Sequence, residues 1–492
     1  PNLHTNTGDG SQNTAIGLQS MFSNAEGYQN TAVGEGALFS NTSGLRNVAV
    51  GCGAAYGNTT GDCNVAIGCE ALKSNQTSNY NVAVGSKALY ANLGGACNVA
   101  VGSCALVSNT CAINNTAVGQ YALCSNTTGD KNNAFGTEAL CSNIAGEYNT
   151  AIGYRTLFGN TSGDYNIAIG RQALDDNTTG GGNIALGRQT LWKNTEAGCN
   201  VGIGHFVLNN NTGIGCQNVG VGTNALYTNT TGVFNVAIGA CTLYYNSTGY
   251  HNDAIGYHAL YNNTGGFYNI GIGREALKAN THGTYNVALG YRTLCKNTTA
   301  SRNVAVGSCV LHDTTTGDCN TAVGWGALRY NATGRYNVAM GFGTSNDAVD
   351  VCCTTAVGFQ ALYNNTIDHN TAIGARAAYS NTTGINNVAV GRTSLYLNTD
   401  GDCNTAIGFS SLYSNVTGDE NTAVGRVSLC ANTYGCRNVS IGGRSMLKNT
   451  TGSCNTAIGA QSVNCNTIGS KNIGIGHCSL FCNVTGGCNV AI

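Results

Sequence analysis

A five-residue motif recurs along the chain at a fixed interval of 17 residues. The string Asn-(Thr/Val)-Ala-(Ile/Val)-Gly begins at Asn13 and returns at this spacing up to Asn200. One extra residue within 209–217 moves the next copy to Asn218, and one missing residue separates the copy at Thr354 from the copy at Asn370. A fixed period of this length is the signature of repeat architectures. The sequence therefore predicts one array of stacked units rather than several globular domains.

The sequence also predicts where the repeats begin and end. We interpret residues 1–12 as the end of a preceding repeat, residues 13–488 as 28 complete repeats, and residues 489–492 as a truncated repeat. The irregular stretches are 209–217 and 337–369, and in the second of these the segment Thr344–Ala348 replaces the usual core residues. A solenoid in water needs capping repeats, and neither end supplies one. We expect a piece of a longer chain, or units that stack end to end.

Composition excludes several other classes of protein. Only 9% of the residues are charged, against about 25% in an ordinary domain, and the formal net charge is −1. The chain has 70 Gly but one Pro. Helical bundles need more charge, nucleic-acid binders need a basic excess, disordered chains need charge or Pro, and collagen needs Pro. A repetitive β architecture is the class of fold that fits this Gly-rich composition with little charge and almost no Pro.

The repeat positions, numbered from the first Asn of each motif, carry separate constraints. Position 3 is Ala in 24 of 29 copies, position 4 is always apolar, and position 5 is Gly in all 28 complete copies. Position 9 is Leu in 22 of 28 copies and position 12 is Asn in 26 of 28. Positions 1–4 favour a strand with positions 2 and 4 on one face. Gly at position 5 indicates a positive φ or a close backbone approach. Positions 12–15 favour a turn. The segment between the strand and this turn forms either a second short strand or one helical turn.

These constraints predict an all-β parallel β-solenoid, or β-roll, with one repeat per coil. Strands stacked at about 4.8 Å would form ladders, meaning columns of equivalent residues from successive coils. We expect positions 4 and 9 to fill the core, and Asn at positions 1 and 12 to stack with side-chain hydrogen bonds along the axis. Position 3 then faces away from the core. Because it is restricted to Ala, Gly and Ser, a second sheet of the same coil or another chain must approach it, and we favour another chain.

The repeat also resembles known families. The segment Asn64–Ala71 resembles the head repeats of trimeric autotransporter adhesins, and the segment Asn115–Gly129 is similar to repeats in fibre proteins of phages and environmental bacteria. The resemblance covers residues 13–492. It implies a left-handed parallel β-roll that forms a trimer, displays an adhesive surface and lies outside the cell.

Three pairs of cysteines occupy the same position in consecutive repeats. Stacking would place the two α-carbons of each pair about 5 Å apart, within the range of a disulfide. Such bridges indicate an oxidising, extracellular setting. The alternative is that Cys replaces Ala or Ser as a small residue. The pairs are Cys52 with Cys69, Cys124 with Cys141, and Cys465 with Cys482.

Many copies of position 12 begin an Asn-x-Ser/Thr sequon, which makes N-glycosylation a hypothesis. The alternative is that a turn written Asn-Thr-Thr-Gly forms the sequon by accident. The sequons begin at Asn41, Asn58, Asn75, Asn126, Asn160, Asn177, Asn229, Asn246, Asn297, Asn331, Asn381, Asn415, Asn449 and Asn483.

Aromatic residues recur at position 10 in about half of the repeats. Consecutive copies would form a ladder that binds sugars or a neighbouring fibre. The preferred alternative is packing against Leu at position 9 of the same chain. The ladder residues are Tyr227, Tyr244, Tyr261, Tyr363, Tyr379, Tyr396 and Tyr413.

No catalytic or cofactor-binding arrangement emerges from the sequence. The eight His residues fall at unrelated positions, and no Gly-Lys-Ser/Thr follows the Gly-rich motifs. The sequence predicts neither metal nor cofactor, no nucleic-acid partner and no membrane span. It favours a non-catalytic extracellular fibre or adhesin shaft, on a cell surface or a virion, that self-associates as a homotrimer or end to end. The alternative is a solenoid that binds polysaccharide or ice through Thr, Asn and Tyr ladders.

Overall fold

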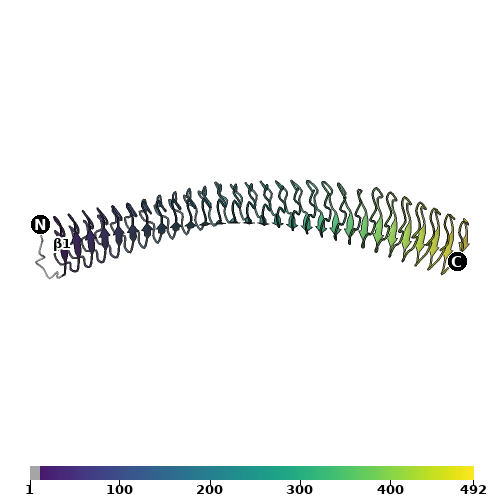
Figure 1. Cartoon of the computed structure of the whole chain (residues 1–492), viewed down its shortest axis with the longest axis horizontal. Coiled ribbons are helices and arrows are strands. Elements are labelled where there is room, and N and C mark those ends of the chain that lie inside the picture. Colours follow the sequence, from purple (N-terminus) through teal and green to yellow (C-terminus); the bar gives the residue numbers. More distant parts are fainter. Residues whose placement is uncertain (1–11) are drawn as a thin grey trace. The chain divides into compact units, whose positions relative to one another are not determined.

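Residues 12–492 are described by a computed structural model, in which each repeat forms one coil of a parallel β-solenoid (Figure 1). The chain divides into two units, residues 1–249 and 250–492. Each unit has the same construction, and neither contains a helix within the described residues. The expected fold class is confirmed. The expected end of a preceding repeat, residues 1–12, lies outside the described residues except for Gln12.

Each coil contributes one strand, formed by positions 2–4. The strands of the first unit are β1 (Thr14–Ile16), β2 (Thr31–Val33), β3 (Val48–Val50), β4 (Val65–Ile67), β5 (Val82–Val84), β6 (Val99–Val101), β7 (Thr116–Val118), β8 (Asn133–Phe135), β9 (Thr150–Ile152), β10 (Ile167–Ile169), β11 (Ile184–Leu186), β12 (Val201–Ile203), β13 (Val219–Val221) and β14 (Val236–Ile238).

The second unit repeats this arrangement. Its strands are β15 (Asp253–Ile255), β16 (Ile270–Ile272), β17 (Val287–Leu289), β18 (Val304–Val306), β19 (Thr321–Val323), β20 (Val338–Met340), β21 (Thr355–Val357), β22 (Thr371–Ile373), β23 (Val388–Val390), β24 (Thr405–Ile407), β25 (Thr422–Val424), β26 (Val439–Ile441), β27 (Thr456–Ile458), β28 (Ile473–Ile475) and β29 (Val490–Ala491).

Within each unit, consecutive strands pair in parallel and in register, so that equivalent positions lie side by side. In β4 and β5, for example, Ala66 pairs with Ala83. Axial hydrogen bonds continue beyond the strands, as where the Leu72 N–H donates to the Ala88 carbonyl at 2.8 Å. The backbone of each coil is therefore held to the next coil around much of its circumference.

The segment between strand and turn is neither a second strand nor a helical turn. It is a run of tight turns in which positions 7 and 9 adopt the left-handed conformation, with φ of 57° at Glu70 and 52° at Leu72. This conformation is uncommon for residues other than Gly. Here the axial hydrogen bonds hold it, and it directs the position 9 side chain into the coil.

The prediction that position 4 fills the core is wrong, and position 3 takes its place. Ala at position 3 is fully buried in coil after coil, as are Ala at position 8 and Leu at position 9, whereas position 4 faces outward. The restriction to small residues has an internal cause. At Gly271 an added Cβ would already lie 3.4 Å from Leu260, and at Gly220 it would lie 2.5 Å from Val207. A coil this narrow has room for only small side chains opposite positions 8 and 9.

Gly at position 5 has both a positive φ and a close backbone approach, the two features that the sequence indicated. Gly68 has a φ of +133°, and a Cβ added there would lie 2.5 Å from the carbonyl oxygen of Gly85 in the next coil. A side chain at this position would be strained and would also collide with backbone. The Gly in every complete copy follows from this geometry.

The two expected Asn ladders are confirmed, and both are buried. At position 12 the Asn58 side-chain amide donates to the side-chain oxygen of Asn41 at 2.8 Å. At position 1 the Asn64 N–H donates to the side-chain oxygen of Asn47 at 2.9 Å, while the Asn64 amide donates to the Ser78 carbonyl at 2.8 Å. These bonds satisfy the polar groups of the turn inside the coil.

The changes in repeat length are absorbed in the position 12–15 turn. Normally the position 12 amide reaches the carbonyl three residues later, but Asn211 reaches Gly215 and Asn365 reaches Ile367. Strand register is unchanged, since Val201 pairs with Val219 and Thr355 pairs with Thr371. An insertion or deletion of one residue therefore leaves the ladders aligned.

Candidate functional surfaces

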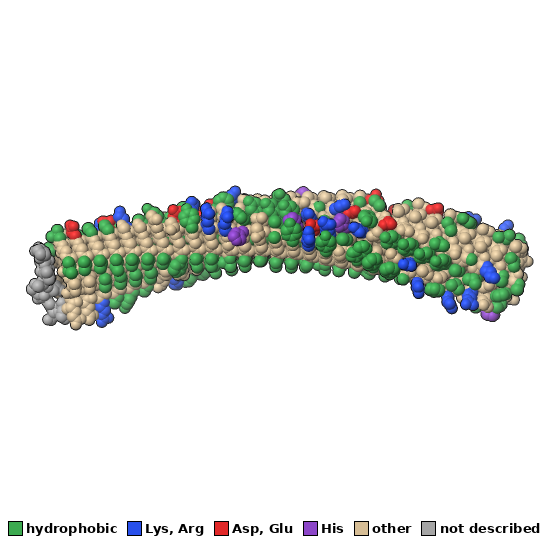
Figure 2. All heavy atoms as spheres, in the orientation of Figure 1, with side chains coloured by type: hydrophobic (Ala, Val, Ile, Leu, Met, Phe, Trp, Pro, Cys, Tyr) green, Lys and Arg blue, Asp and Glu red, His purple; other side chains and the backbone are tan. Residues whose placement is uncertain are grey.

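The outward face of the strands is an exposed apolar ladder. The isoleucine side chains at position 4 remain about two-fifths exposed, with values of 40% for Ile67, 39% for Ile152 and 42% for Ile373, and most of the valines there are partly exposed. Position 4 carries no charge in any copy. Figure 2 shows hydrophobic side chains recurring in rows from coil to coil. We call this surface, position 4 of successive coils, the aliphatic ladder.

The structure brings most of the position 10 tyrosines together. Tyr227 stacks on Tyr244 with ring centroids 5.0 Å apart in the first unit. In the second unit Tyr363, Tyr379, Tyr396 and Tyr413 form a continuous stack with centroid separations of 5.4, 5.3 and 5.1 Å. Tyr261, also in the second unit, lies against His258.

A second aromatic column, at position 6, was missed by sequence reasoning. Trp325 stacks on Phe342 at 4.8 Å, and Phe342 stacks on Phe359 at 5.6 Å. All three rings are nearly half exposed. Aligning every repeat column, and not only position 10, would have found it.

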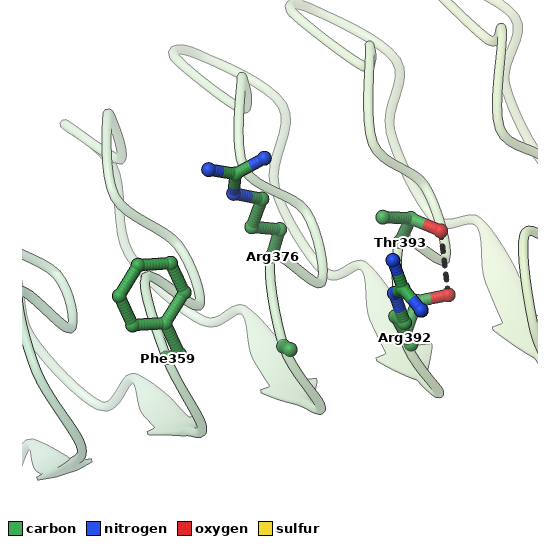
Figure 3. A pocket seen from close by; sticks show the side chains of 5 residues that line it. Phe359, Arg376, Arg392 and Thr393 are labelled. Atoms are coloured by element: carbon green, nitrogen blue, oxygen red, sulfur yellow. Dashed lines mark hydrogen bonds between the residues drawn. The ribbon is translucent and has the colours of Figure 1, made fainter.

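The position 6 column ends in a slot on the surface of the second unit. The coil after Phe359 carries Ala375 at this position, and the next coil carries Arg392. The resulting cavity of about 220 Å³ is lined by Phe359, Ala375, Arg376, Arg392 and Thr393 (Figure 3). We call it the Phe359 slot. It combines an aromatic ring with two guanidinium groups.

Of the three cysteine pairs, the structure brings the thiols of Cys124 and Cys141 together, with their sulfurs 3.1 Å apart. The hydrogen bond from Cys141 lowers the pKa of Cys124 to about 6 and raises the pKa of Cys141. For the other two pairs no thiol–thiol contact is found within the described residues. All 24 cysteines are unbridged in this structure, and disulfide formation stays a prediction.

The sequon asparagines face into the coil. All of them except Asn483 are fully buried. Each amide nitrogen that would carry a glycan donates a hydrogen bond, in most copies within the position 12 ladder, as in Asn160 with Asn143 at 2.7 Å, and at Asn331 to the Gly334 carbonyl at 3.0 Å. Glycosylation stays a prediction, and a glycan can be attached at these positions only before the coil closes.

Charged side chains form small isolated clusters. The nearly buried Glu275 accepts a hydrogen bond from Arg292 at 2.7 Å, which lowers the pKa of Glu275. Burial raises the pKa of Asp175, which lies 3.4 Å from Arg155. Among residues 12–492 no three His, Cys, Asp or Glu side chains converge as metal ligands. Over the same residues, no helix has the length and apolar character needed to cross a bilayer.

No protein family matches the chain at the level of sequence, and no curated protein matches it.

Proposed function

We propose that the chain is a structural, non-catalytic fibre or adhesin shaft that lies outside the cell, on a cell surface or a virion, and associates with copies of itself. Such a fibre is long and presents the same surface side chains at regular intervals along its length. The observation that carries the proposal is the aliphatic ladder, because it offers one uncharged, outward apolar side chain per coil.

The hydrogen bonds inside the coil support the role of a stiff fibre. Backbone hydrogen bonds connect successive coils within a unit, and two buried Asn ladders add to them except where another residue replaces Asn, as at Thr314 and Ala348. Unfolding one coil therefore leaves the buried amides of its neighbours without partners, which costs about 1–3 kcal/mol for each group. Such coupling between neighbours favours a rod that resists local opening.

The exterior supports lateral association. Burying an Ile side chain completely is worth about 1.5–3 kcal/mol, so covering the exposed two-fifths gives roughly 1 kcal/mol per coil. A second copy has the same coil spacing, so its aliphatic ladder matches this one coil by coil. Ten or more matched coils would supply a stable interface. A homotrimer, as the resemblance to adhesin heads implies, is the arrangement we favour over end-to-end stacking.

Light scattering coupled to size-exclusion chromatography tests this proposal. The full chain is expected to elute with a mass near three times its 50.4 kDa. A variant with Lys at Ile67, Ile152, Ile238, Ile373 and Ile458 leaves no run of ten uninterrupted coils on the aliphatic ladder and is expected to shift the mass to 50.4 kDa. Ile214→Lys is the matched control, because Ile214 is 71% exposed but lies in the 209–217 turn. A wild-type monomer at every concentration would contradict self-association.

The alternative function is ligand binding, and the exposed aromatic columns favour it. The Asn ladders are buried, and the Thr59 hydroxyl at position 13 donates to the Gln76 carbonyl at 2.9 Å, so the stacked aromatic rings are the better candidates for contact with polysaccharide. Ice binding would instead use the regular outward strand face. Glycan-array binding supports the first ligand, and thermal hysteresis supports the second.

A further inference from the structure

The position 6 column stops abruptly, and its last ring has an aromatic neighbour on one face but not on the other. Trp325, Phe342 and Phe359 stack with interplanar angles of 16° and 19°, so each inner ring face is covered by a neighbour. The coil beyond Phe359 carries only the methyl group of Ala375 at this position. The face of Phe359 on that side meets the slot rather than another ring.

The slot has the dimensions of one six-membered ring. Phe359 and Arg392 are two coils apart, so about 10 Å separates them along the axis. Stacked carbon atoms need about 3.5–4 Å on each side, which leaves room for a single ring between them. The cavity of about 220 Å³ is smaller than the roughly 300–1,000 Å³ of pockets for drug-sized ligands. In Figure 3 the Phe359 ring and the Arg392 side chain stand on either side of the coil that carries Arg376.

The charge of the slot is positive. The Arg376 guanidinium carbon lies over the Phe359 ring, 5.7 Å from the ring centre, and the Arg376 Nε donates to the side-chain oxygen of Gln360 at 3.1 Å. The Arg392 guanidinium lies 5.9 Å from the Phe409 ring. Across residues 12–492, no carboxylate lies within ion-pair distance of either guanidinium. Guanidinium groups are suited to bind carboxylates through paired hydrogen bonds.

We propose that the Phe359 slot binds one hexuronate residue of an acidic polysaccharide. The sugar ring stacks on Phe359, and its carboxylate pairs with Arg392 and Arg376. The slot lies on the exposed surface, so the polysaccharide chain can continue in both directions from the bound residue. This site goes beyond the fibre proposal and does not depend on it, because it is complete within a single chain.

Calorimetric titration of the full chain with tetragalacturonate, and with cellotetraose as the neutral counterpart, tests the site. We expect tetragalacturonate to bind with an affinity that falls as salt rises, and cellotetraose to bind at least tenfold more weakly. Ala375→Phe fills the slot with a ring that position 6 already accommodates in other coils, and it is expected to weaken tetragalacturonate binding at least tenfold. Arg392→Gln, which alters only an exposed side chain, is expected to have a similar effect. Arg302→Gln removes an exposed arginine elsewhere and serves as the control.

Several results would overturn the assignment. They are absence of tetragalacturonate binding, equal binding of cellotetraose, or unchanged affinity in both Ala375→Phe and Arg392→Gln. Tighter binding of a sulfated tetrasaccharide than of tetragalacturonate would overturn the carboxylate assignment. The fibre proposal is tested separately, by the mass of the particle.

Discussion

The side-chain amide of Asn75 donates to the side-chain oxygen of Asn58, 17 residues earlier, at 2.9 Å. The same amide donates to the Ser78 carbonyl at 3.0 Å, and the Asn75 oxygen accepts from Asn92 at 2.9 Å. One buried side chain thus connects three coils and closes its own turn.

Replacing this side chain is expected to destabilise several coils. Asn75→Ala leaves the buried Asn58 oxygen without its donor, which should lower the free energy of unfolding by about 2–3 kcal/mol. Urea unfolding, combined with amide exchange of the neighbouring coils, measures the effect. Gln76→Ala is the control, since Gln76 is the adjacent exposed residue. Equal stability of the two variants would contradict the role given to the ladder.

The position 12 ladder is interrupted where Thr314 and Ala348 replace Asn. The side-chain oxygens of Asn297 and Asn331, each one coil earlier, are buried without a hydrogen-bond donor. Thr314→Asn restores an amide beside Asn297 and is expected to stabilise the second unit by about 1 kcal/mol, despite loss of the Thr314 hydroxyl bond to Asn331. A rise in the urea midpoint checks this. Ala348→Asn tests the second interruption, and a fall in stability in both variants would refute the explanation.

Two glycines in adjacent coils, Gly68 and Gly94, allow a comparison of how much an added Cβ destabilises the chain at each position. Gly68→Ala places a Cβ against the Gly85 carbonyl at a φ of +133°, and we expect a loss of more than about 3 kcal/mol. Gly94→Ala places its Cβ in open space and should change stability by less than about 0.5 kcal/mol. Thermal unfolding of both variants makes the comparison. Similar melting temperatures would show that position 5 does not require Gly.

We expect the reactivity of the Cys124 thiol, which lies against the Cys141 thiol, to depend on pH. Because the pKa of Cys124 is lowered to about 6 by the Cys141 hydrogen bond, its thiolate should form as pH rises through 6 and be nearly complete at pH 7.5. Burial raises the pKa of Cys430, so this thiol should react only at higher pH. Peptide-level alkylation with iodoacetamide between pH 5 and 9 measures both.

Cys141→Ala removes the donor and should return the Cys124 half-point toward the ordinary value of about 8.5. Oxidised glutathione is expected to join the two cysteines through a mixed disulfide, releasing two glutathione thiols. A Cys124 half-point that is the same with and without Cys141 would contradict the coupling.

Much of the fold could be predicted because each ladder repeats its own chemistry. Gly68 and its equivalents, and the Asn58–Asn75 contact, follow from residues that recur without regard to the variable positions around them. The inside and outside of the strand could not be assigned in this way. Both faces of Val65–Ile67 are apolar, so alternation alone does not tell which face is buried. The sequence signal for the buried face was a compensating change in side-chain size. The bulky Val207 faces Gly220, and Gly220 occupies position 3, where most coils have Ala.

The candidate sites were harder to predict than the fold. The left-handed conformation at Leu72 has no sequence signature, because the next coil imposes it through backbone hydrogen bonds. The Phe359 slot arises from one small residue, Ala375, in a column of large ones. Only a comparison of position 6 across successive coils would have indicated it.

Negative-stain electron microscopy of the purified full chain tests the central claim most directly. A self-associating solenoid predicts elongated particles of uniform width, wider than a single coil. The variant with Lys at Ile67, Ile152, Ile238, Ile373 and Ile458 should give thinner particles of the same length. Compact, rounded particles from the wild-type chain would contradict the fibre, and elongated particles one coil wide would contradict lateral association.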